Sequence, residues 1–253
     1  MTTAVWDPFC SRVNGQLNNY ANHSMTIFKN QTRNVKNKPG EMFSKTSWSQ
    51  EGEDMILSRI FEDRKSGFYI DIGAHHPQRF SNTMFFYQKG WRGINIDALP
   101  GSMAAFRKER QEDINLEIPV SDKEEVLTFY IFNDPALSTF SKTLALHYQK
   151  KEEHFVVSEK QLTTKKLETI FKENLSPGCR IDFLSVDVEG HELNVLKSNN
   201  WSLFKPDIVL TEVLNFEISS FLDSELYRFM YGMDYRFYAK TTNTVFFKLS
   251  QNG

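Results

Sequence analysis

The sequence has few cysteines, no long apolar run and no excess of one charge, and each absence excludes a class of protein. Cys10 and Cys179 are the two cysteines of 253 residues, too few for a disulfide framework or a four-ligand zinc site, so we expect a reducing cytoplasm. No apolar run approaches the roughly 18 residues of a membrane-spanning helix, and the N-terminus lacks the pattern of a secretory signal. A net charge of −2, from 30 basic and 32 acidic residues, excludes a strongly basic nucleic-acid binder.

The first 46 residues differ in composition from the rest of the chain. Of the first 40, seven are Asn and five are Lys or Arg, and periodic apolar spacing is weak apart from Met25, Ile27 and Phe28. We interpret residues 1–46 as a partly ordered N-terminal arm outside the main domain. An arm that binds nucleic acid is the alternative, which five scattered basic residues do not favour.

From residue 47 onward, apolar segments typical of strands alternate with amphipathic segments typical of helices. This alternation predicts a mainly parallel sheet covered on both faces, and the last two strands are close enough in sequence to form an antiparallel hairpin. Residues 136–160 show no regular pattern, and we expect a polar surface excursion near the active site. One helix is expected around residues 221–230. The predicted strands are 68–73, 93–97, 114–120, 126–132, 181–186, 208–213, 234–239 and 243–249.

Acidic residues recur where the predicted core strands end. Asp71 and Asp97 close the first two strands, Asp187 and Glu189 follow the strand at 181–186, and Glu212 closes the strand at 208–213. Ligands of doubly wound sheets bind beyond the carboxyl ends of the strands. These acids therefore predict a binding site at that edge of the sheet.

The segment after the first strand indicates the kind of cofactor. Asp71-Ile72-Gly73-Ala74-His75-His76-Pro77 has a small residue after the strand but lacks the G-x-G-x-x-G pattern that cradles a pyrophosphate. Asp97, at the end of the second strand, is placed to accept hydrogen bonds from ribose hydroxyls. Together they predict an adenosine-containing cofactor without a pyrophosphate. The structural alternatives are a turn-forming Asp71 and an Asp97 that initiates a helix before Pro100.

The segment Asp187-Val188-Glu189-Gly190-His191-Glu192 follows a buried apolar strand. This D-x-E-G-x-E pattern resembles the FkbM-type S-adenosylmethionine-dependent methyltransferases. The resemblance covers roughly residues 47–250 and implies one domain, 47–253, with the Rossmann-like class I methyltransferase fold: an α/β structure with a mainly parallel seven-stranded sheet and an antiparallel C-terminal hairpin. Further segments that resemble the family are Ser49–Asp54, Tyr69–Pro77, Ser81–Thr83, Gly90–Ile94 and Pro119–Asp122.

The resemblance also implies what the site binds. The cofactor would be S-adenosylmethionine, and the methyl group would pass to a hydroxyl of a small carbohydrate-like acceptor, either a nucleotide-activated sugar or a surface-glycan precursor. Asp71 and Gly73 would lie near the methionine portion, Asp97 on the ribose, and Ser121 or Asp122 near the adenine. The full set of expected cofactor-binding residues is Asp71, Gly73, Ala74, His75, Asn82, Asp97, Ala98, Ser121, Asp122 and Asp187.

Methyl transfer to a hydroxyl needs a group that manages one proton. His191 is the expected general base because imidazole titrates near neutrality. Asp187 and Glu189 are expected to orient it, to act as the base themselves, or to ligate a divalent cation such as Mg²⁺ with Glu212. The alternative for His191 is an exposed helix residue, and a metal-free site is also left open.

Two other enzyme classes share part of this pattern. A nicotinamide-dependent oxidoreductase would use the sheet and Asp97, but the glycine pattern that it needs is missing. A nucleotide-sugar glycosyltransferase would use Asp187 and Glu189 as a metal pair, without explaining Asp71 and Asp97. The acceptor's identity and a homodimeric state are left open.

Overall fold

The structure is a computed structural model that describes residues 45–250, so almost all of the predicted arm, 1–46, lies outside the described residues. The main sheet has seven strands in the order β3-β2-β1-β6-β7-β9-β8. Its strands are β1 (Phe68–Ile72), β2 (Arg92–Asp97), β3 (Ile114–Glu117), β6 (Phe183–Val186), β7 (Ile208–Glu212), β8 (Tyr235–Lys240) and β9 (Thr244–Leu249).

The first five strands of this order are parallel, and β9 and β8 are antiparallel to their neighbours. The predicted fold is therefore confirmed, including the hairpin at the C-terminus. All five residues of β1 and all four of β6 are buried, as expected of central parallel strands covered on both faces. The strand order reverses between β1 and β6, which is where doubly wound sheets bind their ligands.

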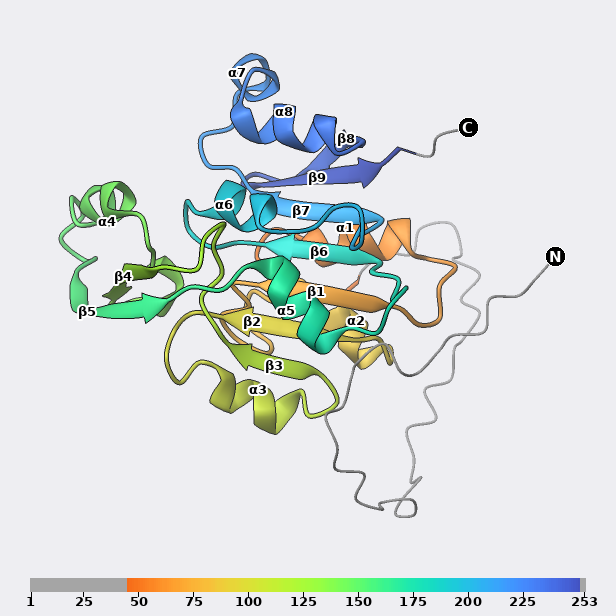
Figure 1. Cartoon of the computed structure of the whole chain (residues 1–253), viewed down its shortest axis with the longest axis horizontal. Coiled ribbons are helices and arrows are strands. Elements are labelled where there is room, and N and C mark those ends of the chain that lie inside the picture. Colours follow the sequence, from red (N-terminus) through yellow and green to blue (C-terminus); the bar gives the residue numbers. More distant parts are fainter. Residues whose placement is uncertain (1–44, 251–253) are drawn as a thin grey trace, which may run out of the picture.

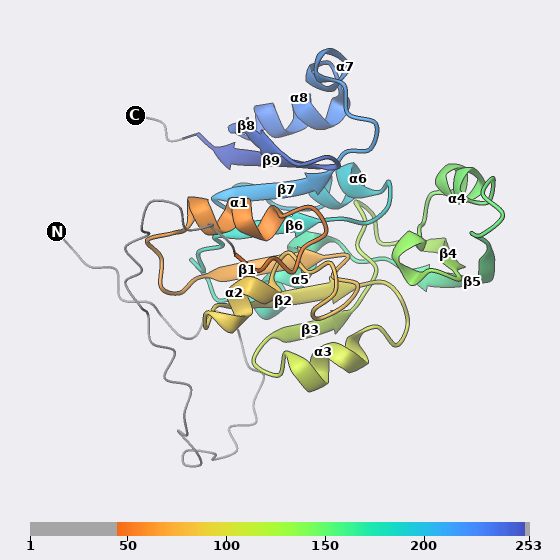
Figure 2. The ribbon, with the colours of Figure 1, turned by 180° about the vertical axis from the view of Figure 1, so that it is seen from behind.

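Helices cover both faces of the main sheet. Figure 2 shows α1 and α2 on one face, where Leu57 and Phe86 pack against Tyr69 and Phe183 of the sheet. Figure 1 shows α5 and α6 on the other face, where an apolar core surrounds Ile70 and Leu184. The helices are α1 (Glu53–Ile60), α2 (Met84–Gln88), α3 (Met103–Glu109), α5 (Leu167–Asn174), α6 (Glu192–Lys197), α7 (Ile218–Leu222) and α8 (Glu225–Gly232).

A second, two-stranded sheet projects beyond the carboxyl ends of the parallel strands (Figure 1, left). It pairs β4 (Val126–Phe132) with β5 (Val156–Thr163), and α4 (Lys142–Tyr148) lies between them in the sequence. The expectation of an irregular excursion over 136–160 was wrong in this respect. β5 is mostly exposed and polar, so its sequence lacks the alternation that reveals a half-buried strand.

One further expectation needs correction. The helix expected around 221–230 is two helices, because the Ser224 hydroxyl accepts a hydrogen bond from the Tyr227 amide and starts α8 anew. The Ser49 hydroxyl donates to the Asp54 carboxylate, and α1 begins after Gly52. None of the described helices is long and apolar enough to cross a membrane.

Candidate active site

A cleft lies where the carboxyl ends of β1, β2 and β6 meet the second sheet; we call it the cofactor cleft. Five of its lining residues come from three strand ends: Gly73 and His75 after β1, Asp97 and Ala98 at β2, and Asp187 after β6. All five belong to the expected cofactor-binding set. The apolar lining includes Ile96, Ile118, Val120, Phe129 and Phe140.

Asp97 is held in place by the backbone around it. Its Oδ2 accepts a hydrogen bond from the His75 amide (2.9 Å), and its Oδ1 accepts one from the Leu99 amide (2.7 Å). Burial raises the pKa of this carboxyl above its ordinary value. The loop after β1 is thereby fixed to the end of β2, with one carboxylate facing the cleft.

Gly73 allows the loop after β1 to contact the loop after β6. Its φ of 81° lies in the left-handed region, and a Cβ atom there would stand 1.6 Å from the carbonyl oxygen of Asp187. The Asp187 amide also donates to the carbonyl oxygen of Ile72 (2.9 Å). Only glycine permits this approach; the small residue was expected to let the backbone approach a ligand, and it also lets the Asp187 backbone approach.

Asp71 lies behind the cofactor cleft and does not line it. Its carboxylate is 5% exposed and accepts a hydrogen bond from the Thr83 hydroxyl (3.1 Å), and desolvation raises its pKa to about 6. Arg110, fully buried, donates to the Thr83 hydroxyl (2.8 Å) and to the carbonyl oxygen of Pro77 (2.8 Å). Asp71 and Arg110 thus support the loop after β1 from beneath.

The remaining expected cofactor residues take other positions. Ala74 is buried against Met103 and Phe106 of α3 and faces away from the cofactor cleft. Asn82 donates to the Ser185 hydroxyl (3.1 Å). It lines a small depression that Asp187, Glu189 and Glu212 also line, which we call the acidic end of the site. These side chains shape the site rather than open into the cofactor cleft.

His191 lies on the cofactor side of the site. Its Nε2 is 2.9 Å from Ser121 Oγ, and the Ser121 hydroxyl is also 3.2 Å from the Asp122 carboxylate. Burial lowers the pKa of the imidazole, so it is neutral at physiological pH. The structure therefore brings His191 to the two residues expected near adenine.

Three carboxylates form a cluster beside the cofactor cleft. The side chains of Asp187, Glu189 and Glu212 each place an oxygen within 4.8 Å of the others. Desolvation raises the pKa of Glu189 to about 7, against the lowering effect of the Tyr148 hydroxyl that donates to it. Asp187 is exposed to solvent in the cleft. Desolvation by the surrounding protein and the charge of Glu189 nevertheless raise the pKa of its carboxyl.

The loop that carries this cluster is tied down from two sides. Glu192 accepts hydrogen bonds from the amides of Val188 (3.1 Å) and Gly190 (2.9 Å). The Thr139 hydroxyl donates to the carbonyl oxygen of Glu189, whose φ is 54°. Tyr148 and Thr139 belong to the segment with no readable motif, so nothing in the sequence pointed to them.

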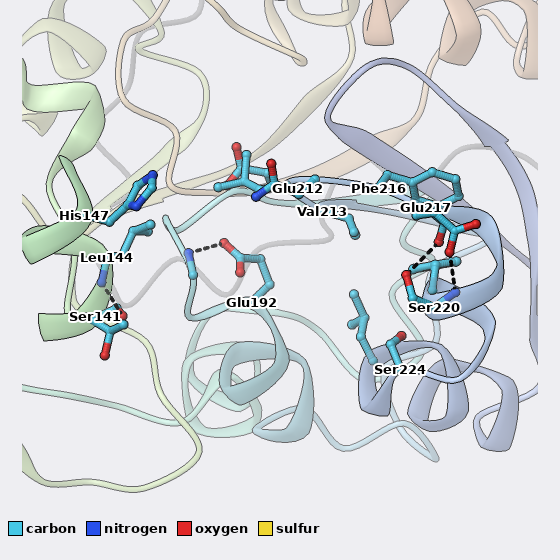
Figure 3. Close-up of a pocket in the computed structure, with 16 residues that line it drawn as sticks. Ser141, Leu144, His147, Glu192, Glu212, Val213, Phe216, Glu217, Ser220 and Ser224 are labelled. Carbon is cyan, nitrogen blue, oxygen red and sulfur yellow. Dashed lines mark hydrogen bonds between the residues drawn. The ribbon is translucent and has the colours of Figure 1, made fainter. Parts of the chain in front are cut away.

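A larger pocket opens next to the cluster, between α4 and α7 (Figure 3). This α4–α7 pocket has a volume of about 580 Å³. Glu212 lines both it and the acidic end of the site, where Asp187 and Glu189 also lie. Since Asp187 and Glu189 line the cofactor cleft too, the acidic end of the site adjoins both the cofactor cleft and the α4–α7 pocket.

The mainly parallel seven-stranded sheet, and a cleft at its switch point with a carboxylate on β2, define a Rossmann-like nucleotide-cofactor fold. Residues 71–237, more than half of the chain, match the model of the methyltransferase FkbM domain. The chain belongs to this family and is a methyltransferase, which confirms the family resemblance of its motifs. No curated protein matches the chain.

Proposed function

We propose that this methyltransferase transfers the methyl group of S-adenosylmethionine to a hydroxyl of a small, carbohydrate-like acceptor. The observation that carries the proposal is that three depressions adjoin one another through shared carboxylates. The cofactor cleft ends at Asp187, the acidic cluster stands at the junction, and the α4–α7 pocket begins at Glu212. A donor in the first and an acceptor in the last would meet at the carboxylates.

The cofactor cleft suits an adenosine without a pyrophosphate. The Asp97 carboxylate faces the cleft with each oxygen bonded once to the backbone, which leaves lone pairs for the hydroxyls of a ribose. The ring centroids of Phe129 and Phe140 are 4.6 Å apart, and the two rings offer apolar surface for a planar base. The cluster of acids, rather than an array of glycine amides, then faces the sulfonium end.

The carboxylates are suited to the proton transfer. In the reaction the acceptor oxygen attacks the methyl carbon as the carbon–sulfur bond breaks, and the hydroxyl proton must leave. Glu189, which stands at the junction and accepts a hydrogen bond from the Tyr148 hydroxyl, can accept that proton. His191 is bonded to Ser121, so we assign it to positioning the cofactor rather than to the role of base.

The donor set of the cluster fits Mg²⁺ or Mn²⁺, because Asp187, Glu189 and Glu212 offer three carboxylate oxygens close together. A bound cation would offset the repulsion among the carboxylates and lower the pKa of an acceptor hydroxyl. Electron paramagnetic resonance should detect one bound Mn²⁺ per chain, with at least tenfold weaker binding in Glu212→Gln and unchanged binding in the exposed control Glu225→Gln. A wild-type chain that binds no Mn²⁺ would remove the metal from the proposal.

The function is tested by incubating the full chain with S-adenosylmethionine labelled in the methyl group and a panel of hydroxylated acceptors. We expect label in a product whose mass exceeds that of its acceptor by one methylene, and loss of the label in Asp187→Asn and Glu189→Gln. Transfer of label to a nitrogen or carbon atom, or full activity in both variants, would contradict O-methylation assisted by the cluster.

A further inference from the structure

We infer that the α4–α7 pocket binds an acceptor that has an apolar part and carries no phosphate or carboxylate. This inference rests on the proposed function, because it treats the pocket as the acceptor end of that site. It goes further by choosing between the two kinds of carbohydrate acceptor, since nucleotide-activated sugars carry a diphosphate.

The charges of the pocket argue against an anionic ligand. Glu192, Glu212 and Glu217 line it, whereas none of its lining residues within the described chain is Lys or Arg. The Lys240 ammonium lies 4.7 Å from the centre of the Phe216 ring but does not line the pocket. Proteins hold phosphates with arginine, lysine or free backbone amides, and the lining side chains of this pocket offer neither of these two cations to a diphosphate.

The backbone amides at the start of α7 are already used. The Glu217 carboxylate accepts hydrogen bonds from the amides of Ser219 (3.2 Å) and Ser220 (2.9 Å), as Figure 3 shows for Ser220. A helix N-terminus that is capped by its own carboxylate does not offer these donors to a ligand.

The rest of the wall is apolar. Leu144 of α4 faces Phe216 across the pocket, with Val213 between them (Figure 3). Phe221 and Leu226 complete the apolar lining. Ile218 and Leu222 of α7, which do not line the pocket, are 50% and 43% exposed. These surfaces match an aglycone or another hydrocarbon part beside the reacting hydroxyl.

A cation in the acidic cluster would not make the pocket suitable for a diphosphate. The cluster stands at the junction with the cofactor cleft, which is where the acceptor hydroxyl must lie for in-line transfer. A diphosphate bound there would occupy the place of the reacting hydroxyl. The lack of Lys and Arg in the lining and the position of the pocket therefore exclude the same ligands.

Saturation-transfer NMR tests this inference with two probes, octyl β-D-glucoside below its micellar concentration and UDP-glucose, each with the full chain, S-adenosylhomocysteine and Mg²⁺. We expect binding of the octyl glucoside alone, weakened at least fivefold in Leu144→Ala and Phe216→Ala. The exposed control Leu203→Ala should bind like the wild type, and retained S-adenosylhomocysteine binding shows that each variant is folded.

Binding of UDP-glucose, or of neither probe while S-adenosylhomocysteine binds, would overturn the inference. Equal binding of the octyl glucoside by wild type and both pocket variants would do the same. Failure of the wild-type chain to bind S-adenosylhomocysteine would instead contradict the proposed function.

Discussion

Ser121 Oγ lies 2.9 Å from His191 Nε2, which joins two segments separated by 70 residues on the cofactor side of the site. His191 directly precedes α6, and Ser121 lies shortly after the end of β3. The contact places the imidazole along the wall of the cofactor cleft. It also separates two roles that the motif alone leaves combined, namely holding the cofactor and accepting the proton.

Replacing His191 with Ala should therefore affect cofactor binding more than turnover. Loss of one hydrogen bond costs about 0.5–1.5 kcal/mol, which corresponds to a roughly threefold to tenfold higher Kd for S-adenosylhomocysteine. Calorimetry and steady-state kinetics would measure the two effects, with His154→Ala as a control. A kcat that falls by about 100-fold or more at unchanged Kd would restore His191 as the base.

Gly73 and Gly90 form a matched pair for testing the contact between the loops. Both have positive φ, but a Cβ at Gly73 meets the Asp187 carbonyl, whereas a Cβ at Gly90 meets nothing within 4 Å. Gly90→Ala should lose about 1–2 kcal/mol of unfolding free energy, the cost of the left-handed conformation alone. Gly73→Ala should lose clearly more and should abolish S-adenosylhomocysteine binding. Similar urea unfolding curves for the two variants would contradict the contact.

Asp71 predicts a pH dependence of stability. Its folded pKa of about 6 exceeds the value of 3.8 for an ordinary Asp, so the folded state binds the proton more tightly than the unfolded state does. Stability should therefore decrease as the pH rises from about 4 to about 6, by about 3 kcal/mol from this group.

The near-isosteric change Asp71→Asn removes this titration. The variant should be more stable than the wild type at pH 8, and the difference should shrink below pH 4. Urea unfolding at both pH values measures it, with the exposed Asp63→Asn as a control. A variant that is less stable than the wild type at pH 8 would show that the Asp71 charge stabilises the fold.

The strands of the main sheet were predictable from local sequence. The buried strands β1 and β6 are short, mainly apolar segments, because both faces of a central parallel strand are covered. Asp97 and Gly73 follow from the rule that ligands meet such sheets at their carboxyl ends. These positions depend on the order of elements along the chain, which a single sequence displays.

Other parts of the site depend on contacts that no local pattern reveals. Arg110 is fully buried, although arginine is rarely so, and its partners Tyr69 and Thr83 come from different elements. Tyr148 reaches Glu189 only because the second sheet folds α4 toward the loop after β6. His191 directly precedes α6, and its side chain is hydrogen-bonded to Ser121, 70 residues away in the sequence.

Calorimetric titration of the full chain with S-adenosylhomocysteine tests the central claim most directly. The account predicts one binding site, no binding of NAD, and a Kd about 10–100-fold higher in Asp97→Ala, because a carboxylate that bonds the ribose is lost. Asp63→Ala should bind like the wild type. A wild-type chain that binds NAD but not S-adenosylhomocysteine, or an Asp97→Ala variant with unchanged affinity, would contradict it.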